Sequence, residues 1–260
     1  MTEITTLISL GGVALIAGAI DAIAGGGGLL CLPALLLAGL NPVAALATNK
    51  LQGTFGTASA TATFWRKGLI NPQHLWLTVA MTFVGAAVGV AAITYAPTQL
   101  LKLVMPPLLI IIALYFAFAP KFSNESKPPR LPFSRFTFFF APVIGFYDGI
   151  FGPGTGAFFI LSLTSLFGLG VIEATGRTKL FNFASNIAAL LMFVIAGKPI
   201  WLIGLVMGVC QFIGAQIGSH LAIRNGAAII RPLLVIVSLA MAAKLMLDPA
   251  NPVRLWILGQ

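Results

Sequence analysis

The stretch Asp21-Ala22-Ile23-Ala24-Gly25-Gly26-Gly27-Gly28 places a carboxylate before four glycines, and Ala47-Thr48-Asn49-Lys50-Leu51 follows it after a short apolar run. A second copy of this arrangement reads Asp148-Gly149-Ile150-Phe151-Gly152-Pro153-Gly154-Thr155-Gly156 and is followed by Ala174-Thr175-Gly176-Arg177-Thr178-Lys179-Leu180. Each copy sets an acid, a glycine-rich break and a lysine in sequence that is too apolar to face water. A water-soluble core does not need that combination twice.

The sequence around both copies indicates a membrane protein. Of the 260 residues, 58% are hydrophobic and 8% are charged, whereas soluble domains carry about 25% charged residues. Apolar runs near the roughly 20 residues needed for a helical span recur along the chain. These runs lack the alternating pattern of membrane β-barrels, so we expect an all-α membrane protein, a polytopic helical bundle.

Charge and cysteine content exclude several functions. The net charge of +9 comes mostly from Lys and Arg at the ends of the predicted spans, where the positive-inside bias accounts for them, so we expect no nucleic-acid partner. Cys31 and Cys210 lie in apolar runs without the spacing of a metal site, and the sequence contains no ATP-binding motif. We therefore expect no metal, no cofactor and no catalytic centre.

The two copies belong to an internal repeat. Asp148 follows Asp21 by 127 positions and, after a two-residue insertion, Lys179 follows Lys50 by 129 positions. The spacing of 129 continues through further matches: Phe83-Val84-Gly85-Ala86 with Phe212-Ile213-Gly214-Ala215, Lys102 with Arg231, and Pro120 with Pro249. The sequence thus predicts two homologous transmembrane repeats, residues 1–120 and 136–260, joined by a basic, proline-rich linker at 121–135.

Each repeat is expected to hold a glycine-broken helical hairpin and three spans. In the first repeat the hairpin covers 4–40, and the spans cover about 43–65, 75–95 and 99–119. Counting Lys and Arg does not decide whether 4–40 crosses the membrane or re-enters it. The half-length second limb and an N-terminus without Lys or Arg favour re-entry. Re-entry would make the repeats inverted and would put both termini outside the cytoplasm.

The same motifs carry a family resemblance. Asp-x-Ile-Ala-Gly-Gly-Gly-Gly and Ala-Thr-Asn-Lys-Leu in the first copy, with Gly-Phe-Tyr-Asp-Gly-Ile-Phe-Gly-Pro-Gly and Lys-Leu-x-Asn-x-x-Ser-Asn in the second, resemble the sulfite exporter TauE/SafE family and in particular its YfcA-like branch. The resemblance covers nearly the whole chain. It implies a bacterial inner-membrane permease with two duplicated halves that transports a small anion.

The glycine breaks are the first candidate site. A helix that begins after Gly28 or Gly156 presents free N–H groups and a partial positive charge, from which an anion site can be built. The alternative is that the glycines only allow helices to cross closely. We favour the anion site because both breaks lie beside an acid, and its residues would be Gly26, Gly27, Gly28, Gly154, Thr155 and Gly156.

Lys50 and Lys179 are the second candidates. A lysine at the centre of a span costs about 2.5–3.5 kcal/mol and usually faces the protein interior or a watery path. The two lysines either contact the anion or pair with Asp21 and Asp148, and these roles are compatible. The aspartates are either proton carriers or ionised partners of nearby groups, and we favour ionised partners.

Further polar residues extend the predicted substrate site. Asn182 and Asn186 are four residues apart and share a helix face, and Asn49 precedes Lys50 directly. Arg177 lies in the inserted residues of the second repeat, so the two half-sites would be unequal. Other polar residues of the spans, such as Gln211, are more simply explained by hydrogen bonds between helices.

Together these features predict a secondary transporter that exports a small sulfur-containing or organic anion. Its energy would come from the substrate gradient or from a coupling ion, and the sequence leaves proton and sodium open. An ion-coupled uptake permease with the same fold is the main alternative. A membrane-embedded enzyme or a scaffold fits less well, because no nucleophile–base pair is present and a scaffold needs no repeated buried charge. The anion and the lipid bilayer are the expected partners, and a homodimer is left open.

Overall fold

The computed structural model describes residues 4–94 and 124–225, together with residue 107. The first part of the chain forms α1 (Ile4–Ala24), α2 (Gly28–Leu37), α3 (Pro42–Arg66), the 3₁₀ turn η1 (Pro72–Leu75) and α4 (Trp76–Thr94). The second part forms α6 (Phe133–Arg135), the π turn η2 (Phe136–Phe140), α7 (Ala141–Ile150), α8 (Thr155–Ser165), α9 (Val171–Ile195) and α10 (Trp201–Asn225). No strand occurs in these ranges, so the all-α prediction is confirmed for the described residues.

Four of the described helical segments are long and apolar enough to cross a membrane: α1, Pro72–Thr94, α9 and α10. The predicted span at 75–95 corresponds to Pro72–Thr94. The predicted span at 43–65 forms the 25-residue helix α3, whose many polar side chains face the protein interior. The predicted span at 99–119, and the matches of Lys102 with Arg231 and of Pro120 with Pro249, lie outside the described residues.

Local sequence explains where several helices begin and end. Asn41 caps α3, because its Oδ1 accepts a hydrogen bond from the Ala44 N–H at 2.9 Å, and Pro42 occupies the first turn, where no N–H is needed. The helix ends before Gly68, which adopts a φ of 70°. α6, η2 and α7 follow one another directly, and the π turn within them was not predicted.

The described part of the expected linker, residues 124–135, lies against the loop after α8. The Lys127 N–H donates to the Gly168 carbonyl at 2.7 Å, and the Arg130 N–H donates to the Leu166 carbonyl at 2.9 Å. These bonds hold the segment to the helical bundle. The division of the chain at 120 and 135 stays a prediction.

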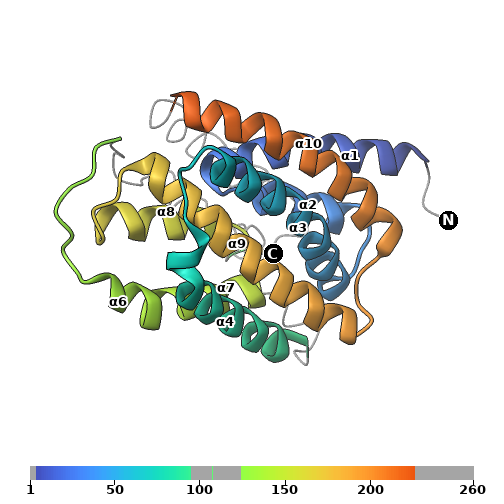
Figure 1. Ribbon diagram of the computed structural model, residues 1–260. Coiled ribbons are helices and arrows are strands. Elements are labelled where there is room, and N and C mark those ends of the chain that lie inside the picture. The colour runs from blue at the N-terminus through green and yellow to red at the C-terminus, as the bar shows by residue number, and fades with distance from the viewer. Residues whose placement is uncertain (1–3, 95–106, 108–123, 226–260) are drawn as a thin grey trace, which may run out of the picture.

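Six of the described helices pack as two outer pairs and one central pair. Figure 1 shows α1 and α10 side by side along one edge of the bundle and α4 and α7 along the opposite edge, with α9 between them. α1 and α10 run parallel, since Gly11 faces Cys210 and Ala19 faces Gly218. α4 and α7 are likewise parallel.

The central helices α3 and α9 run antiparallel. At one end the Thr48 hydroxyl accepts a hydrogen bond from the Ile200 N–H, just beyond α9, at 3.0 Å. At the other end Gly176 of α9 lies against Phe64. α3 is also parallel to α10, because Gly204 faces Leu51 and the Ser59 hydroxyl donates to the Phe212 carbonyl at 3.0 Å.

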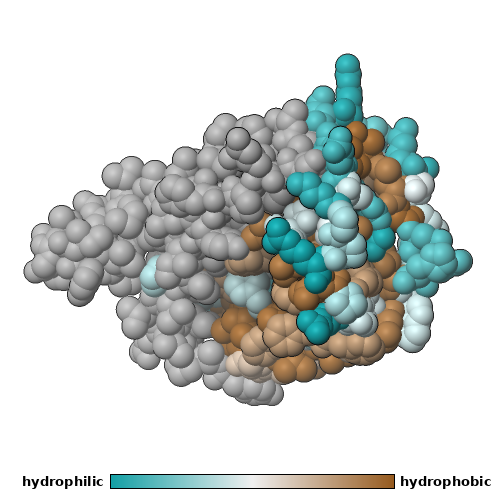
Figure 2. All heavy atoms as spheres, turned by 90° about the vertical axis from the view of Figure 1, so that its left-hand side faces the viewer, coloured by the Kyte–Doolittle hydropathy of each residue, from teal (hydrophilic) through white to brown (hydrophobic). Residues whose placement is uncertain are grey.

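The outer surface of the described part is largely apolar. In Figure 2 hydrophobic side chains gather mainly in the lower part of the coloured surface, while hydrophilic side chains lie at the top and right and also stand among the hydrophobic ones. Large apolar side chains stand exposed on several helices, among them Ile8, Ile16, Val84, Leu191 and Val209. A surface of this kind is suited to contact with lipid, in keeping with a membrane protein.

Close contact between helix backbones makes the outer pairs sensitive to added atoms. A Cβ at Gly214 of α10 would collide with the Leu15 carbonyl oxygen of α1, whereas a Cβ at Gly12 would meet no atom within 4 Å. We expect Gly214→Ala to lower the free energy of unfolding by about 1–3 kcal/mol, the usual cost of overpacking. Gly12→Ala, the matched control, should be neutral or stabilising by up to about 1 kcal/mol. Thermal unfolding in detergent measures both, and equal melting temperatures would contradict the packing described.

Candidate functional site

Two helix breaks meet inside the bundle. Residues 25–27 separate α1 from α2, and residues 151–154 separate α7 from α8. The breaks lie at the expected glycines and touch one another, because a Cβ added at Gly25 would lie 2.5 Å from the Cα of Gly156. Gly25 has a φ of 77° and Gly154 a φ of 83°, backbone conformations that glycine adopts without strain.

An aspartate bridges each break. Asp21, in the last turn of α1, accepts a hydrogen bond at Oδ1 from the Gly27 N–H at 3.1 Å. Asp148, near the end of α7, accepts at Oδ1 from the Thr155 hydroxyl at 2.8 Å. Each carboxylate therefore lies at the N-terminus of the helix that follows its own break. In this conformation the chain's own carboxylates contact the groups that were predicted to bind an external anion.

The buried lysines pair across the two halves of the chain. Lys50 Nζ lies 2.8 Å from Asp148 Oδ1, and both side chains are at least 95% buried. Lys179 Nζ lies 3.9 Å from Asp21 Oδ2 and also donates to the main-chain carbonyl of Asp21. This carbonyl belongs to the C-terminal turn of α1, whose partial negative charge favours a cation. Of the two roles considered for the lysines, charge pairing is the one that the geometry displays.

The two pairs are unequal. The Asp148 carboxylate is held by two groups, Lys50 and Thr155, and its side chain is 5% exposed. The Asp21 carboxylate makes one hydrogen bond and one longer ionic contact, and its side chain is 14% exposed. Asp148 is thus held more tightly than Asp21.

A polar cavity of about 30 Å³ lies between the two breaks. Its lining residues are Asp21, Gly25, Gly28, Asn49, Lys50, Gly53, Thr57, Asp148, Gly152, Thr155, Gly156, Asn182, Asn186 and Gln211. Since a cavity needs roughly 10–15 Å³ to hold one water, it has room for about two waters. We term this contracted conformation closed, although the space is not sealed from its surroundings.

Most of the predicted site residues meet at this cavity. The members of the predicted set that line it are Gly28, Asn49, Lys50, Thr155, Gly156, Asn182, Asn186 and the two aspartates. Lys179 does not line it and contacts Asp21 instead. Gly26, Gly27 and Gly154 lie in the breaks without lining the cavity.

Two polar lining residues were not in the predicted set. Gln211 of α10, which we had assigned to contacts between helices, lines the cavity. Thr57 of α3 also lines it and accepts a hydrogen bond from Asn186 Nδ2 at 3.5 Å. The signal available for Thr57 was its place 129 residues before Asn186, the spacing that relates the two lysines.

The structure places Arg177 elsewhere. Its guanidinium lies 2.5 Å from Glu173 Oε1 and 5.3 Å from the centre of the Phe133 ring. These groups line a separate pocket of about 300 Å³ together with residues 68–71 and His74. Arg177 is therefore not brought to the central cavity.

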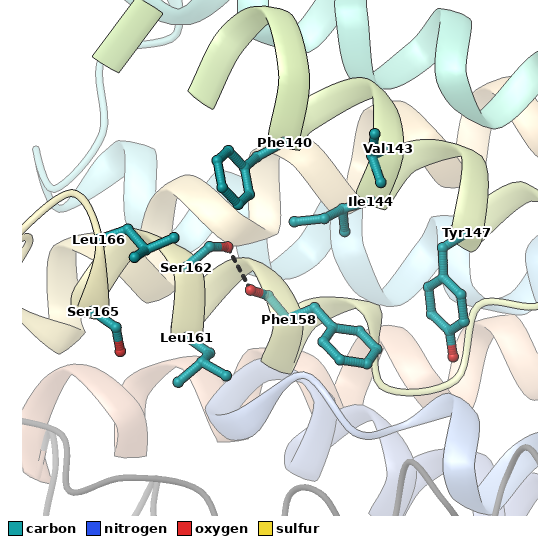
Figure 3. A pocket seen from close by; sticks show the side chains of 9 residues that line it. All are labelled: Phe140, Val143, Ile144, Tyr147, Phe158, Leu161, Ser162, Ser165 and Leu166. Carbon is teal, nitrogen blue, oxygen red and sulfur yellow. Dashed lines mark hydrogen bonds between the residues drawn. The ribbon is translucent and has the colours of Figure 1, made fainter. Parts of the chain in front are cut away.

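A larger cavity, about 570 Å³, lies between α7 and α8 but lacks the chemistry of an anion site. Figure 3 shows its lining, which is apolar apart from Tyr147, Ser162 and Ser165. The Ser162 hydroxyl donates to the Phe158 carbonyl at 2.6 Å, and the Tyr147 hydroxyl donates to the Pro153 carbonyl at 2.6 Å. None of its nine lining residues is charged, so the smaller cavity at the breaks is the better candidate site despite its size.

Known proteins resemble this chain over nearly its whole length. The family model described as sulfite exporter TauE/SafE matches residues 10–245. The chain belongs to this family. A probable membrane transporter protein ORF9 of Sinorhizobium sp. is 48% identical over 244 residues, which cover 94% of each chain. The probable membrane transporter protein YfcA of Escherichia coli (strain K12) is 46% identical over 91% of this chain and 88% of its own.

A third relative, a probable membrane transporter protein of Haemophilus influenzae, is 40% identical over 91% of this chain and 92% of its own. The family and these relatives are membrane transporters rather than enzymes. The expected resemblance to the YfcA-like branch of the TauE/SafE family is thereby confirmed.

The buried pair can be tested by removing its charges singly and together. We expect Lys50→Met to lower the free energy of unfolding by about 3–5 kcal/mol, because it leaves the Asp148 carboxylate buried without its counter-charge. The double variant Lys50→Met/Asp148→Asn should recover most of that loss. Arg177→Ala, which breaks the partly exposed pair with Glu173, should cost less than about 1 kcal/mol. Unfolding in detergent measures all three, and a double variant no more stable than Lys50→Met would show that the pairing contributes little.

Proposed function

We propose that this protein is a secondary transporter that exports a small sulfur-containing or organic anion across the bacterial inner membrane. The observation that carries the proposal is the closed polar cavity at the two helix breaks, flanked by buried charge pairs that join the two halves. Charges at membrane depth are costly and serve mainly at transport paths. Broken helices at corresponding positions of two repeats are a common site plan in transporters.

We further propose that residues 1–120 and 136–260 are inverted repeats. The outer pairs support this, because exchanging the two repeats turns the pair of α1 and α10 into the pair of α7 and α4. The antiparallel α3 and α9 are the corresponding central helices. Their contact at Thr57 and Asn186 joins residues that the repeat spacing makes equivalent.

The same helix directions support re-entry of the hairpin at 4–40. α1 and α3 both run parallel to α10, as their contacts along that helix indicate. Two consecutive long helices can be parallel only if the segment between them returns to the starting side. The 10-residue α2 provides that return and agrees with a half-length limb.

In the proposed mechanism the anion enters when one repeat moves relative to the other and the cavity expands. It then takes the place of a carboxylate at the helix N-termini of Gly28 and Thr155. Lys50 provides positive charge, and Asn49, Asn182 and Asn186 provide neutral hydrogen-bond donors. Lys179 holds Asp21 from outside the cavity.

An anion panel tests the function. Purified protein is heated with sulfite, thiosulfate, small sulfonates or small carboxylates, and the proposal expects at least one of them to raise the melting temperature. Saturation at 100 times the dissociation constant adds about 2.7 kcal/mol of stability, a shift of several degrees. Asn186→Leu should abolish the shift, because it removes a donor at the cavity, while the exposed-loop control Lys198→Ala should keep it. No shift with any of these anions would argue against the proposed substrate class.

Topology can be tested with two exposed lysines at opposite ends of the central helices. Lys67 follows α3 and Lys198 follows α9. After Cys31→Ala and Cys210→Ala, single cysteines at these positions are labelled with a membrane-impermeant maleimide in spheroplasts. Inverted repeats with the basic 66–74 loop inside predict that Lys198→Cys reacts directly and Lys67→Cys reacts only after permeabilisation. Equal labelling before permeabilisation would exclude inverted repeats.

A further inference from the structure

Three residues that line the central cavity keep a buried oxygen without a hydrogen-bond partner. Within the described part of the chain these atoms are Asp148 Oδ2, Asn182 Oδ1 and Gln211 Oε1. The three residues are 4%, 5% and 3% exposed, respectively. A buried acceptor left unpaired is costly, and here three residues that line the same small space each keep one.

All three atoms are acceptors, so an anion in this closed cavity would leave them unpaired. They need a hydrogen-bond donor or a cation. Carboxylate and amide oxygens are the ligands that hard cations prefer. This conformation therefore favours a cation or a hydrogen-bond donor, whereas the proposed substrate is an anion.

Size and charge narrow the class of cation. A space of about 30 Å³ admits a small ion or water but not a polyatomic oxyanion, which carries several oxygens that are each about as large as a water. The lining holds two carboxylates, Asp21 and Asp148, against one ammonium, Lys50. Lys179 lies outside the cavity and pairs with Asp21 at 3.9 Å, so the two carboxylates are balanced by two lysines. A singly charged ion therefore adds the smallest excess of positive charge, whereas a divalent ion would be repelled more strongly by Lys50.

We propose that the closed cavity binds one sodium ion through the free oxygens of Asp148, Asn182 and Gln211. The inference rests on the proposed transport function, because it names the coupling ion of the same site. Sodium occupies the cavity when the anion does not, since the closed space does not hold both. Asp148 then contacts Lys50 through one oxygen and the ion through the other.

The test compares chloride salts of three cations at equal ionic strength. Purified protein without added substrate is heated in sodium, potassium or choline chloride. We expect a saturable rise of several degrees in melting temperature with sodium only. Equal melting temperatures in the three salts would overturn the proposal and leave water as the occupant. A rise that appears in every salt as the pH is lowered would instead assign the site to a proton.

Single substitutions of the lining residues test where the ion binds. Gln211→Leu and Asn182→Leu should each lose at least half of the sodium-dependent rise. The matched controls Ser219→Ala and Thr178→Val remove unpartnered buried hydroxyls that do not line the cavity, so they should keep the full rise. Loss in the controls as well would place sodium elsewhere. If Gln211→Leu fails to fold, Gln211→Glu keeps an oxygen ligand and should retain the rise at equal or lower sodium concentration.

Running the anion panel in potassium salts separates this inference from the proposed function. An anion-dependent rise in potassium, without any effect of sodium, would preserve the transporter proposal and reject the sodium site. A sodium effect without a response to any of the anions would preserve the sodium site and reject the proposed substrate class.

Discussion

The fold depends on two ion pairs that each join a lysine of one half to the aspartate of the other. Lys50 reaches Asp148, and Lys179 reaches Asp21. A single charge buried at these positions would be very costly, and removing one partner of a buried pair usually is. Neither half can therefore keep its lysine buried at low cost without the other. The repeated motif in the sequence describes one shared centre rather than two separate sites.

The glycine breaks and the charge pairs depend on one another. Each break exposes the C-terminal carbonyls of one helix and the N-terminal N–H groups of the next, which helices normally leave unsatisfied. At the first break the Asp21 carbonyl accepts hydrogen bonds from the Gly25 N–H at 2.8 Å and from Lys179, and the Asp21 carboxylate accepts one from the Gly27 N–H. The lysine and the aspartate thus add polar contacts at both ends of an interrupted helix in a setting where water is scarce. The closely packed outer pairs, α1 with α10 and α4 with α7, hold the breaks in contact.

Much of this centre could be predicted because the cost of buried charge makes the relevant residues stand out in an apolar chain. The spacing of Asn182 and Asn186 placed both on one helix face, and both line the cavity. Arg177 and Lys179 are only two residues apart, so they point to different faces of α9, and this spacing alone argues against a shared site. The partner of each lysine could not be derived, because it depends on how α3 and α9 cross. Gln211 was missed for the same reason, since a single glutamine in an apolar helix does not show what it faces.

The two charge pairs differ in strength, so one half of the centre should open at lower cost than the other. Opening the cavity for an anion requires one carboxylate to leave its helix N-terminus. Asp148 would give up a 2.8 Å ion pair and the Thr155 hydroxyl together. Asp21 would give up one hydrogen bond to Gly27 and an ionic contact at 3.9 Å, while Lys179 could stay bound to the main-chain carbonyl. A contact at 3.9 Å is weaker than one at 2.8 Å in the same surroundings, and Asp21 is also the more exposed acid. In the proposed cycle the first half therefore opens at lower cost, while Asp148 stays in place as the fixed ligand of the cavity.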